Sequence, residues 1–430
     1  MTPYLSQIAR LLKSILLRPA DASKRPSAQF VPGKHTPFTF SGGIAVSWWY
    51  SEDTFRAIDA VAALTIESSS DFRDCDVETV ASAVTSTLQE LCLDKNLFHG
   101  DAVFLGQRDT LFDCRKTPPP ELATAISEAI ATNLRARIGR RCTIYAVPRI
   151  RTASFELEND SVQVIAKADA DAWQKLIEKG FEFDGWSPLR PQVGDRQDRT
   201  YAPPSDFECV LVAEERGTSA GAKFNSVLRF RKLAAVVHAV ASKDSPHRIH
   251  KSMARPFDFL VQFPHGSIHE GRITRSDCAP VIPYFASDVQ ISSEGVESVR
   301  AWYDATGRCD KPHRDRVEKA ANFLNRGLNA EDIEAYINYF VALDALFGQR
   351  GSVEASILEG VESLELESAF SEKAEWLFDL RNEIVHGGSR YVSEWPKYPR
   401  YTQHFRSKPM DDVRVLAQLA VLGAPQLFAS

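Results

Sequence analysis

Residues 375–391 read EWLFDLRNEIVHGGSRY, and this stretch carries the strongest structural signal in the chain. Apolar residues recur at helical spacing as far as Ile384 and two glycines follow, which predicts a helix that ends close to His386. Arg381 and Asn382 lie one turn earlier. Cations in a last turn are favoured by the helix dipole by about 0.3–1 kcal/mol, so a structural role must be weighed against a catalytic one.

The polar face of this predicted helix points to chemistry. Asn382 and His386 are four residues apart and share that face with Glu375 and Asp379, so we expect His386 to be exposed and able to exchange protons. Arg381 projects from the edge of the apolar face. One cation that holds a phosphate and one proton carrier suffice to cleave RNA, because the substrate's own 2′-hydroxyl is the nucleophile.

An acidic residue interrupts the apolar stripe of the preceding helix. The stripe of residues 333–347 is formed by Ile333, Ile337, Phe340 and Phe347. Asp344 falls within this stripe, so we expect its carboxylate to be buried and to need a cationic partner. Arg381 is the predicted partner. Such an ion pair serves a catalytic site or merely sets the helix register, and both possibilities remain open.

Two short motifs together resemble a known superfamily. VALDALFG at 341–348 followed by LRNEIVHG at 380–387 resembles the HEPN superfamily, specifically its Apea-like branch. Arg381, Asn382 and His386 match the catalytic motif, and Asp344 stands where the branch more often has Glu.

The resemblance covers roughly residues 315–430. It implies a four-helix bundle and an endoribonuclease that acts on RNA without a metal or other cofactor. It also implies a homodimer formed through the helical domain, and often a role as the toxic effector of a bacterial anti-phage or toxin system. Two alternatives remain: an inactive HEPN module that dimerises or binds a partner or nucleic acid, and a structural protein in which Arg381 and His386 only cap the bundle.

The segment after the motif, SRYVSEWPKYPRYTQHFRSK at 389–408, interleaves cations with aromatic residues. Aromatic rings stack on single-stranded bases and cations contact phosphates. The predicted RNA-binding residues are Arg390, Trp395, Lys397, Tyr398, Arg400, Tyr401 and Arg406. The alternative is a surface loop whose aromatic rings cover the bundle.

The whole chain is predicted to have an α+β fold, in which a mixed α/β portion precedes the helical bundle. We divide it into an N-terminal α+β sensing or regulatory domain (1–186), a linker or long loop (187–206), a second mixed segment (207–300) and the helical domain (301–430). The N-terminal portion is the candidate site for a phage or host trigger. The first 20 residues predict an amphipathic helix that docks on the protein rather than spanning a membrane.

Composition limits the remaining classes of function. The 430 residues carry a net charge of -6, which argues against non-specific coating of nucleic acid. The 7 cysteines are scattered and form no CxxC pair, so neither a disulfide framework nor a zinc site is indicated. A cytoplasmic protein without a membrane span is the expectation. The pairs His247/His250 and His265/His269 are interpreted as surface histidines.

Overall fold

A computed structural model of the chain describes residues 3–18, 36–39, 47–92, 94, 96–157, 160–180, 207–243, 259–265, 272–275, 280–283, 285, 287–366 and 368–429. These residues form two compact units, which are described separately. Unit 1 comprises Met1–Arg140 and Arg216–Ala222, and unit 2 comprises Arg141–Glu215 and Lys223–Ser430. The division between these two units falls near residue 140, and the predicted linker at 187–206 lies outside the described residues.

Unit 1 consists mainly of helices, with a two-stranded antiparallel sheet formed by β1 and β2. Its described elements are α1 (Pro3–Ser14), β1 (Thr36–Thr39), β2 (Ser47–Tyr50), α2 (Glu52–Ser68), η1 (Ser70–Phe72), α3 (Val77–Leu91), α4 (Gly100–Phe104), η2 (Leu111–Cys114) and α5 (Pro119–Arg137).

The first helix docks through one face, as its pattern predicts. Ile8, Leu11 and Leu12 recur at helical spacing and are buried in the core of unit 1. α1 contacts α2, which begins with a capping box in which Ser51 and Thr54 satisfy each other's backbone amides. The amphipathic N-terminal segment is thus part of the folded core.

Unit 2 is built on a six-stranded sheet of described strands in the order β5-β6-β7-β3-β8-β9. The pairs β5–β6, β6–β7, β3–β8 and β8–β9 are antiparallel, and a separate parallel pair joins β10 to β4. The strands are β3 (Gly139–Pro148), β4 (Ile150–Arg151), β5 (Phe155–Leu157), β6 (Val162–Ala166), β7 (Phe207–Gly217), β8 (Phe259–Pro264), β9 (Arg272–Arg275) and β10 (Val289–Gln290).

Both faces of the sheet are covered, which explains why β7 is apolar without interruption from Cys209 to Ala213. Leu211 belongs to the core shared with α7 (Ser219–Ser242), whereas Val210 and Val212 face the opposite cluster, where Trp173 of α6 (Ala170–Glu178) is buried. Alternate residues of a strand point to opposite faces, so a strand buried on both sides needs no polar alternation.

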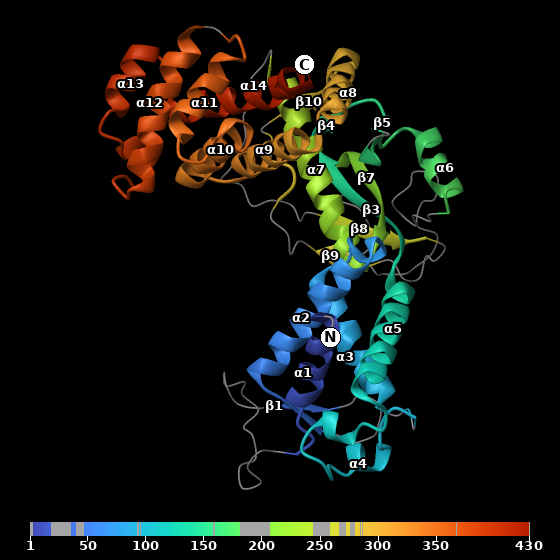
Figure 1. Cartoon of the computed structure of the whole chain (residues 1–430). Helices are drawn as coiled ribbons and strands as arrows, with labels where there is room; N and C mark the ends of the chain where they lie inside the picture. The colour runs from blue at the N-terminus through green and yellow to red at the C-terminus, as the bar shows by residue number, and fades with distance from the viewer. Residues whose placement is uncertain are drawn as a thin grey trace. The chain divides into compact units, whose positions relative to one another are not determined.

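The C-terminal part of unit 2 is helical. Its elements are α8 (Ser293–Arg308), α9 (Lys311–Asn329), α10 (Asp332–Phe347), α11 (Val353–Glu362), α12 (Ser368–Val385), η4 (Val392–Glu394), α13 (Tyr398–Phe405) and α14 (Pro409–Ala429). α10 and α14 each contact both α9 and α12 (Figure 1). Gly327 permits the close approach of α9 and α10, because a Cβ there would lie 2.4 Å from a ring carbon of Tyr339.

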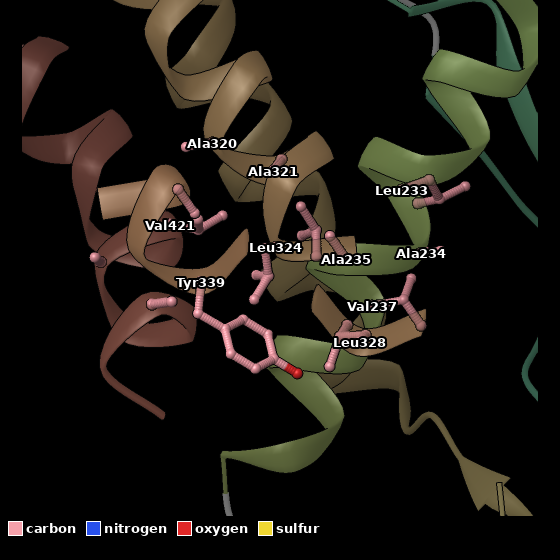
Figure 2. Packing of buried hydrophobic residues seen from close by; sticks show 14 of the residues in the cluster. Leu233, Ala234, Ala235, Val237, Ala320, Ala321, Leu324, Leu328, Tyr339 and Val421 are labelled. Atoms are coloured by element: carbon pink, nitrogen blue, oxygen red, sulfur yellow. The ribbon is translucent and has the colours of Figure 1, made fainter. Parts of the chain in front are cut away.

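The helical part does not have a core of its own. Leu233 and Val237 of α7 belong to the same buried cluster as Leu324 and Leu328 of α9. Figure 2 shows side chains of this cluster on both helices, with Leu233 pointing away from α9. One continuous apolar cluster runs from the sheet through α7 to Val421 of α14. The predicted mixed α+β class with a helical C-terminal region is confirmed, but sheet and helices share a single core in unit 2. No helix within the described ranges is long and apolar enough to cross a membrane.

Candidate active site

α12 presents its motif at the C-terminal end of a well-packed helix. Leu377, Leu380 and Ile384 are buried, as their spacing predicts, and the hydroxyl of Tyr336 on α10 donates to the Leu377 carbonyl at 2.7 Å. Burial raises the pKa of Tyr336 well above its usual value, so the hydroxyl keeps its proton. The backbone that carries the motif is therefore fixed by packing and by a buried hydrogen bond.

A glycine terminates α12 and sets the position of His386. Gly387 has φ of +77°, a left-handed conformation that costs most other residues about 1–2 kcal/mol. Its amide donates to the Ile384 carbonyl at 3.0 Å, and the Gly388 amide donates to Glu383 at 2.9 Å. These two bonds form a Schellman motif, and the helix ends where the glycine pair predicts. His386 is left as the exposed C-cap residue, and its ring has no hydrogen bond or ion pair with any described residue.

Arg381 is half-buried, and its contacts come from its own helix. Its Nη1 donates to Asn382 Oδ1 at 3.1 Å, and its guanidinium carbon lies 5.7 Å from the ring centroid of Phe378. Such a distance allows a cation–π interaction. Five residues along an ideal helix correspond to about 140° of rotation, so Arg381 and His386 leave α12 in different directions.

The structure contradicts the predicted burial of Asp344. Asp344 is exposed, although the stripe residues Phe340 and Phe347 are buried. The buried face of α10 is instead centred on Tyr336, Tyr339 and Leu343, because α9, α12 and α14 surround it. A carboxylate oxygen of Asp344 lies against Gly348, so a side chain at position 348 would clash with it.

The predicted contact between Asp344 and Arg381 is not formed. Both side chains are described, and no hydrogen bond or ion pair joins them. Of the four predicted catalytic residues, the structure therefore brings Arg381 and Asn382 together, exposes His386 at the same helix end, and leaves Asp344 outside this group.

Two of the predicted base-stacking rings are buried. Trp395 has 2% and Tyr401 0% of its surface exposed, so neither ring is available to a nucleic-acid base in this arrangement. Both pack in edge-on or tilted geometry around Trp376 of α12, together with Phe405. For Trp395 and Tyr401 the alternative interpretation applies: they cover the helical core. Tyr398 is half-buried, whereas Tyr391 is 54% exposed.

Two carboxylates that the sequence analysis missed anchor this segment. Asp379 of α12 accepts hydrogen bonds from the Trp395 indole at 3.2 Å and from Lys397 Nζ at 2.9 Å. Asp412 of α14 accepts from the Tyr401 hydroxyl at 2.9 Å and from Lys373 at 2.8 Å. Asp412 lies in the first turn of its helix, where acids are common for electrostatic reasons, so its sequence position offered no distinctive signal.

Most predicted phosphate-binding cations are already engaged. Arg390 pairs with Glu394, whose pKa it lowers through a hydrogen bond, and Lys397 pairs with Asp379. The guanidinium of Arg400 lies 5.3 Å from the Trp376 ring centroid. Arg406 is exposed and forms no ion pair with the described part of the chain. It is thus the predicted RNA-binding cation whose charge is most available.

No group of three or more His, Cys, Asp or Glu side chains among the described residues is arranged to hold a metal ion. Of the histidines considered in the sequence analysis, His265 is exposed, and His247, His250 and His269 lie outside the described ranges. Comparison with protein-family models, curated proteins and solved structures found no match.

Proposed function

We propose that this protein is a metal-independent endoribonuclease of the HEPN type that uses Arg381 and His386. The supporting observation is the end of α12, where a Schellman motif exposes His386 without a side-chain partner in the described chain and Asn382 orients the guanidinium of Arg381. An exposed proton carrier and a phosphate-binding arginine at the same helix end are the groups that cleavage by a 2′-hydroxyl requires.

In the proposed reaction, Arg381 binds the scissile phosphate and Asn382 holds Arg381 or contacts the phosphate. The 2′-oxygen forms a bond to phosphorus while the bond from phosphorus to the 5′-oxygen breaks. The products are a 2′,3′-cyclic phosphate and a 5′-hydroxyl end. His386 takes the proton of the 2′-hydroxyl or gives one to the leaving 5′-oxygen. Because Asp344 does not hold Arg381, the mechanism assigns it no role.

We further propose that the enzyme is a homodimer and the toxic effector of a bacterial anti-phage or toxin system, regulated by its N-terminal portion. These proposals rest on the resemblance of VALDALFG and LRNEIVHG to the Apea-like branch. The second candidate is an inactive HEPN module that dimerises or binds a partner. It is favoured by one observation, the missing contact between Asp344 and Arg381.

Cleavage of RNA in EDTA tests the proposal. We expect wild-type protein to produce 2′,3′-cyclic phosphate ends, and His386→Ala to abolish cleavage while its melting temperature stays within about 2 °C, since an exposed side chain contributes little to stability. His99→Ala is a matched control, because His99 is an exposed histidine of unit 1 whose side chain makes no capping hydrogen bond. Equal cleavage by wild type and His386→Ala would refute the assignment, and absence of cleavage by wild type would favour the inactive module.

A further inference from the structure

A cleft of about 490 Å³ opens in unit 2, away from the end of α12. Its lining residues come from the C-terminal part of α8, the first turns of α9 and Lys232 of α7, together with Asp160. Its volume is within the range of about 300–1,000 Å³ that is typical of small-molecule sites. It is lined by Asp160, Lys232, Tyr303, Asp304, Thr306, Gly307, Arg308, Arg314 and Glu318.

One group of charges in the wall is already paired within the protein. The Lys232 side chain is 8% exposed, and its Nζ lies 2.9 Å from both Asp160 and Glu318. Asp160 is also approached at 3.5 Å by Arg229. A ligand that competed for these groups would strand a buried charge, so they form the framework of the cleft and not its binding surface.

Two hydrogen-bond donors in the wall have no partner among the residues that the structure describes. The Tyr303 hydroxyl is buried without a hydrogen bond, and burial raises the pKa of Tyr303 well above its usual value. Arg314 donates from Nη2 to the carbonyls of Gly307 and Cys309 at 2.9 Å and 3.0 Å, yet its buried Nε has no acceptor. Buried polar groups almost always have a partner, so these two donors call for an acceptor that the described part of the chain does not supply.

The rim adds an uncommitted cation and one uncommitted acid. Arg308 and Asp304 are exposed on α8, and neither forms an ion pair with the described residues. Outside the paired group of Lys232, Asp160 and Glu318, the cleft therefore offers two arginines and a phenol as donors against one carboxylate, that of Asp304. Arginine binds carboxylate and phosphate oxygens in a forked geometry, so this surplus favours an anionic ligand.

We propose that the cleft binds a small organic anion whose carboxylate or phosphate group is held by Arg308 and Arg314. Tyr303 donates a hydrogen bond to the ligand oxygen nearest the wall, and Asp304 accepts one from an amino or hydroxyl group of the ligand. This site is independent of the proposed RNA chemistry, because none of its lining residues belongs to α12 or to the segment at 389–408.

Isothermal titration calorimetry on the full-length protein tests the site, with citrate as the carboxylate probe and adenosine 5′-monophosphate as the phosphate probe. We expect saturable binding of at least one probe, and the stronger one identifies the preferred acid. Arg308→Gln and Tyr303→Phe are each expected to weaken that binding about tenfold or more, since each removes one donor to an anion. Arg300→Gln is the control, because Arg300 lies on the same helix, pairs with Glu297 and does not line the cleft.

Both test variants are expected to fold, since Arg308 is exposed and the Tyr303 hydroxyl has no hydrogen-bond partner in the described ranges of the chain. Absence of saturable binding of either probe would overturn the proposal. So would equal binding by wild type, Arg308→Gln and Tyr303→Phe. The readout does not involve RNA, so this test stands or fails separately from the proposed ribonuclease.

Discussion

At the scale of single residues, burial separates the side chains of α10 and α12 that support the fold from those that do not. His386 and Asp344 are exposed, whereas Leu377 and Leu343 are buried almost completely. Arg381 lies between these extremes, since its stem is partly covered and its head contacts Asn382 and the face of an aromatic ring. Substitutions at these positions are therefore expected to differ sharply in their effect on stability.

Replacing Asp344 is expected to cost little. Because its carboxylate is exposed and does not pair with Arg381, Asp344→Ala should change the free energy of unfolding by no more than about 0.5 kcal/mol. The double variant with Arg381→Met should show simple additivity in chemical denaturation. A loss of several kcal/mol that Arg381→Met recovers would instead show that the two side chains interact.

Asp76 is the N-cap of α3, and its hydrogen bonds are expected to make the stability of the protein fall at acid pH. Burial acts to raise its pKa, but hydrogen bonds from the Thr218 hydroxyl and the Thr79 amide, each 2.7 Å long, outweigh burial and lower it. A carboxylate whose pKa is lower in the folded state stabilises the protein above its unfolded pKa of about 4 and loses this contribution as the pH falls further. Wild type should thus lose more stability than Asp76→Asn between pH 7 and about pH 3.

Thr218→Val is the companion variant, because valine keeps the shape of this buried threonine but lacks the hydroxyl donor. Thermal unfolding at the two pH values should show a reduced acid sensitivity for Thr218→Val as well. If both variants lose as much stability at acid pH as wild type does, the hydrogen bonds of Asp76 are not the source of the acid sensitivity.

At the scale of elements, the segment from η4 to α13 is a cover tied to three helices. Asp332 of α10 accepts a hydrogen bond from the Val392 amide at 2.8 Å, Asp379 of α12 binds Trp395, and Asp412 of α14 binds Tyr401. Its rings therefore close the end of the helical core. Any contact with RNA falls to its exposed residues.

Trp395 and Tyr391 distinguish the two roles of this segment. Trp395→Ala removes a ring that is 2% exposed and should destabilise the protein by about 3–5 kcal/mol. Tyr391→Ala removes a ring that is 54% exposed and should change stability by about 0.5 kcal/mol or less, so any effect on affinity for an uncleavable RNA is direct. Denaturation and RNA titration of both variants provide the measurement. If Trp395→Ala is as stable as wild type but fails to bind RNA, the result would instead support base stacking by Trp395.

At the scale of the whole molecule, the helical part of unit 2 shares its core with the sheet. Phe230 and Leu233 of α7 and Val317 of α9 belong to the same buried cluster as Leu211 of β7. A fragment that contains only residues 301–430 would expose the surface that α7 covers. Experiments on the proposed active site should therefore use the full chain.

The proposed dimer is tested on the full chain by light scattering. We expect the mass of a homodimer, because two copies of Arg381 and His386 around one cleft would double the positive field at the bound phosphate. Lys408 is an exposed cation two residues after Arg406, in the same cationic and aromatic segment. Replacing Arg406 and Lys408 by Ala should leave this mass unchanged. It should also reduce the slope of log affinity against log salt for single-stranded RNA by roughly 1.4, since two phosphate contacts are lost.

Lys397→Ala is the control for charge, because Lys397 is committed to Asp379 and should contribute less to the salt dependence. If the protein is a monomer and still cleaves RNA, the proposal of a cleft shared by two copies is wrong. An unchanged salt slope in the double variant would remove Arg406 and Lys408 from the RNA-binding surface.

Local patterns in the sequence identified the features whose cause is local. Helical periodicity located α10 and α12, the glycine pair predicted the end of α12, and the polar face of that helix predicted the exposure of His386. The same holds for α1, whose buried face follows from its spacing alone. Backbone preference and side-chain period act within a few residues, so they can be interpreted without knowing the neighbours.

The features that depend on distant neighbours emerged only in the folded structure. Asp344 shares a stripe with apolar residues but is exposed, because the packing of α9, α12 and α14 around α10 decides which side of that helix is covered. Trp395 and Tyr401 belong to a segment whose composition is typical of an RNA-binding loop, but both rings are buried. Asp379 and Asp412 hold them by hydrogen bonds, and Trp395 packs against Trp376. A helix with apolar residues on several sides offers more than one possible buried face. Only contacts between segments far apart in the chain select one of them, since burial free energy depends on the surface that a neighbour covers.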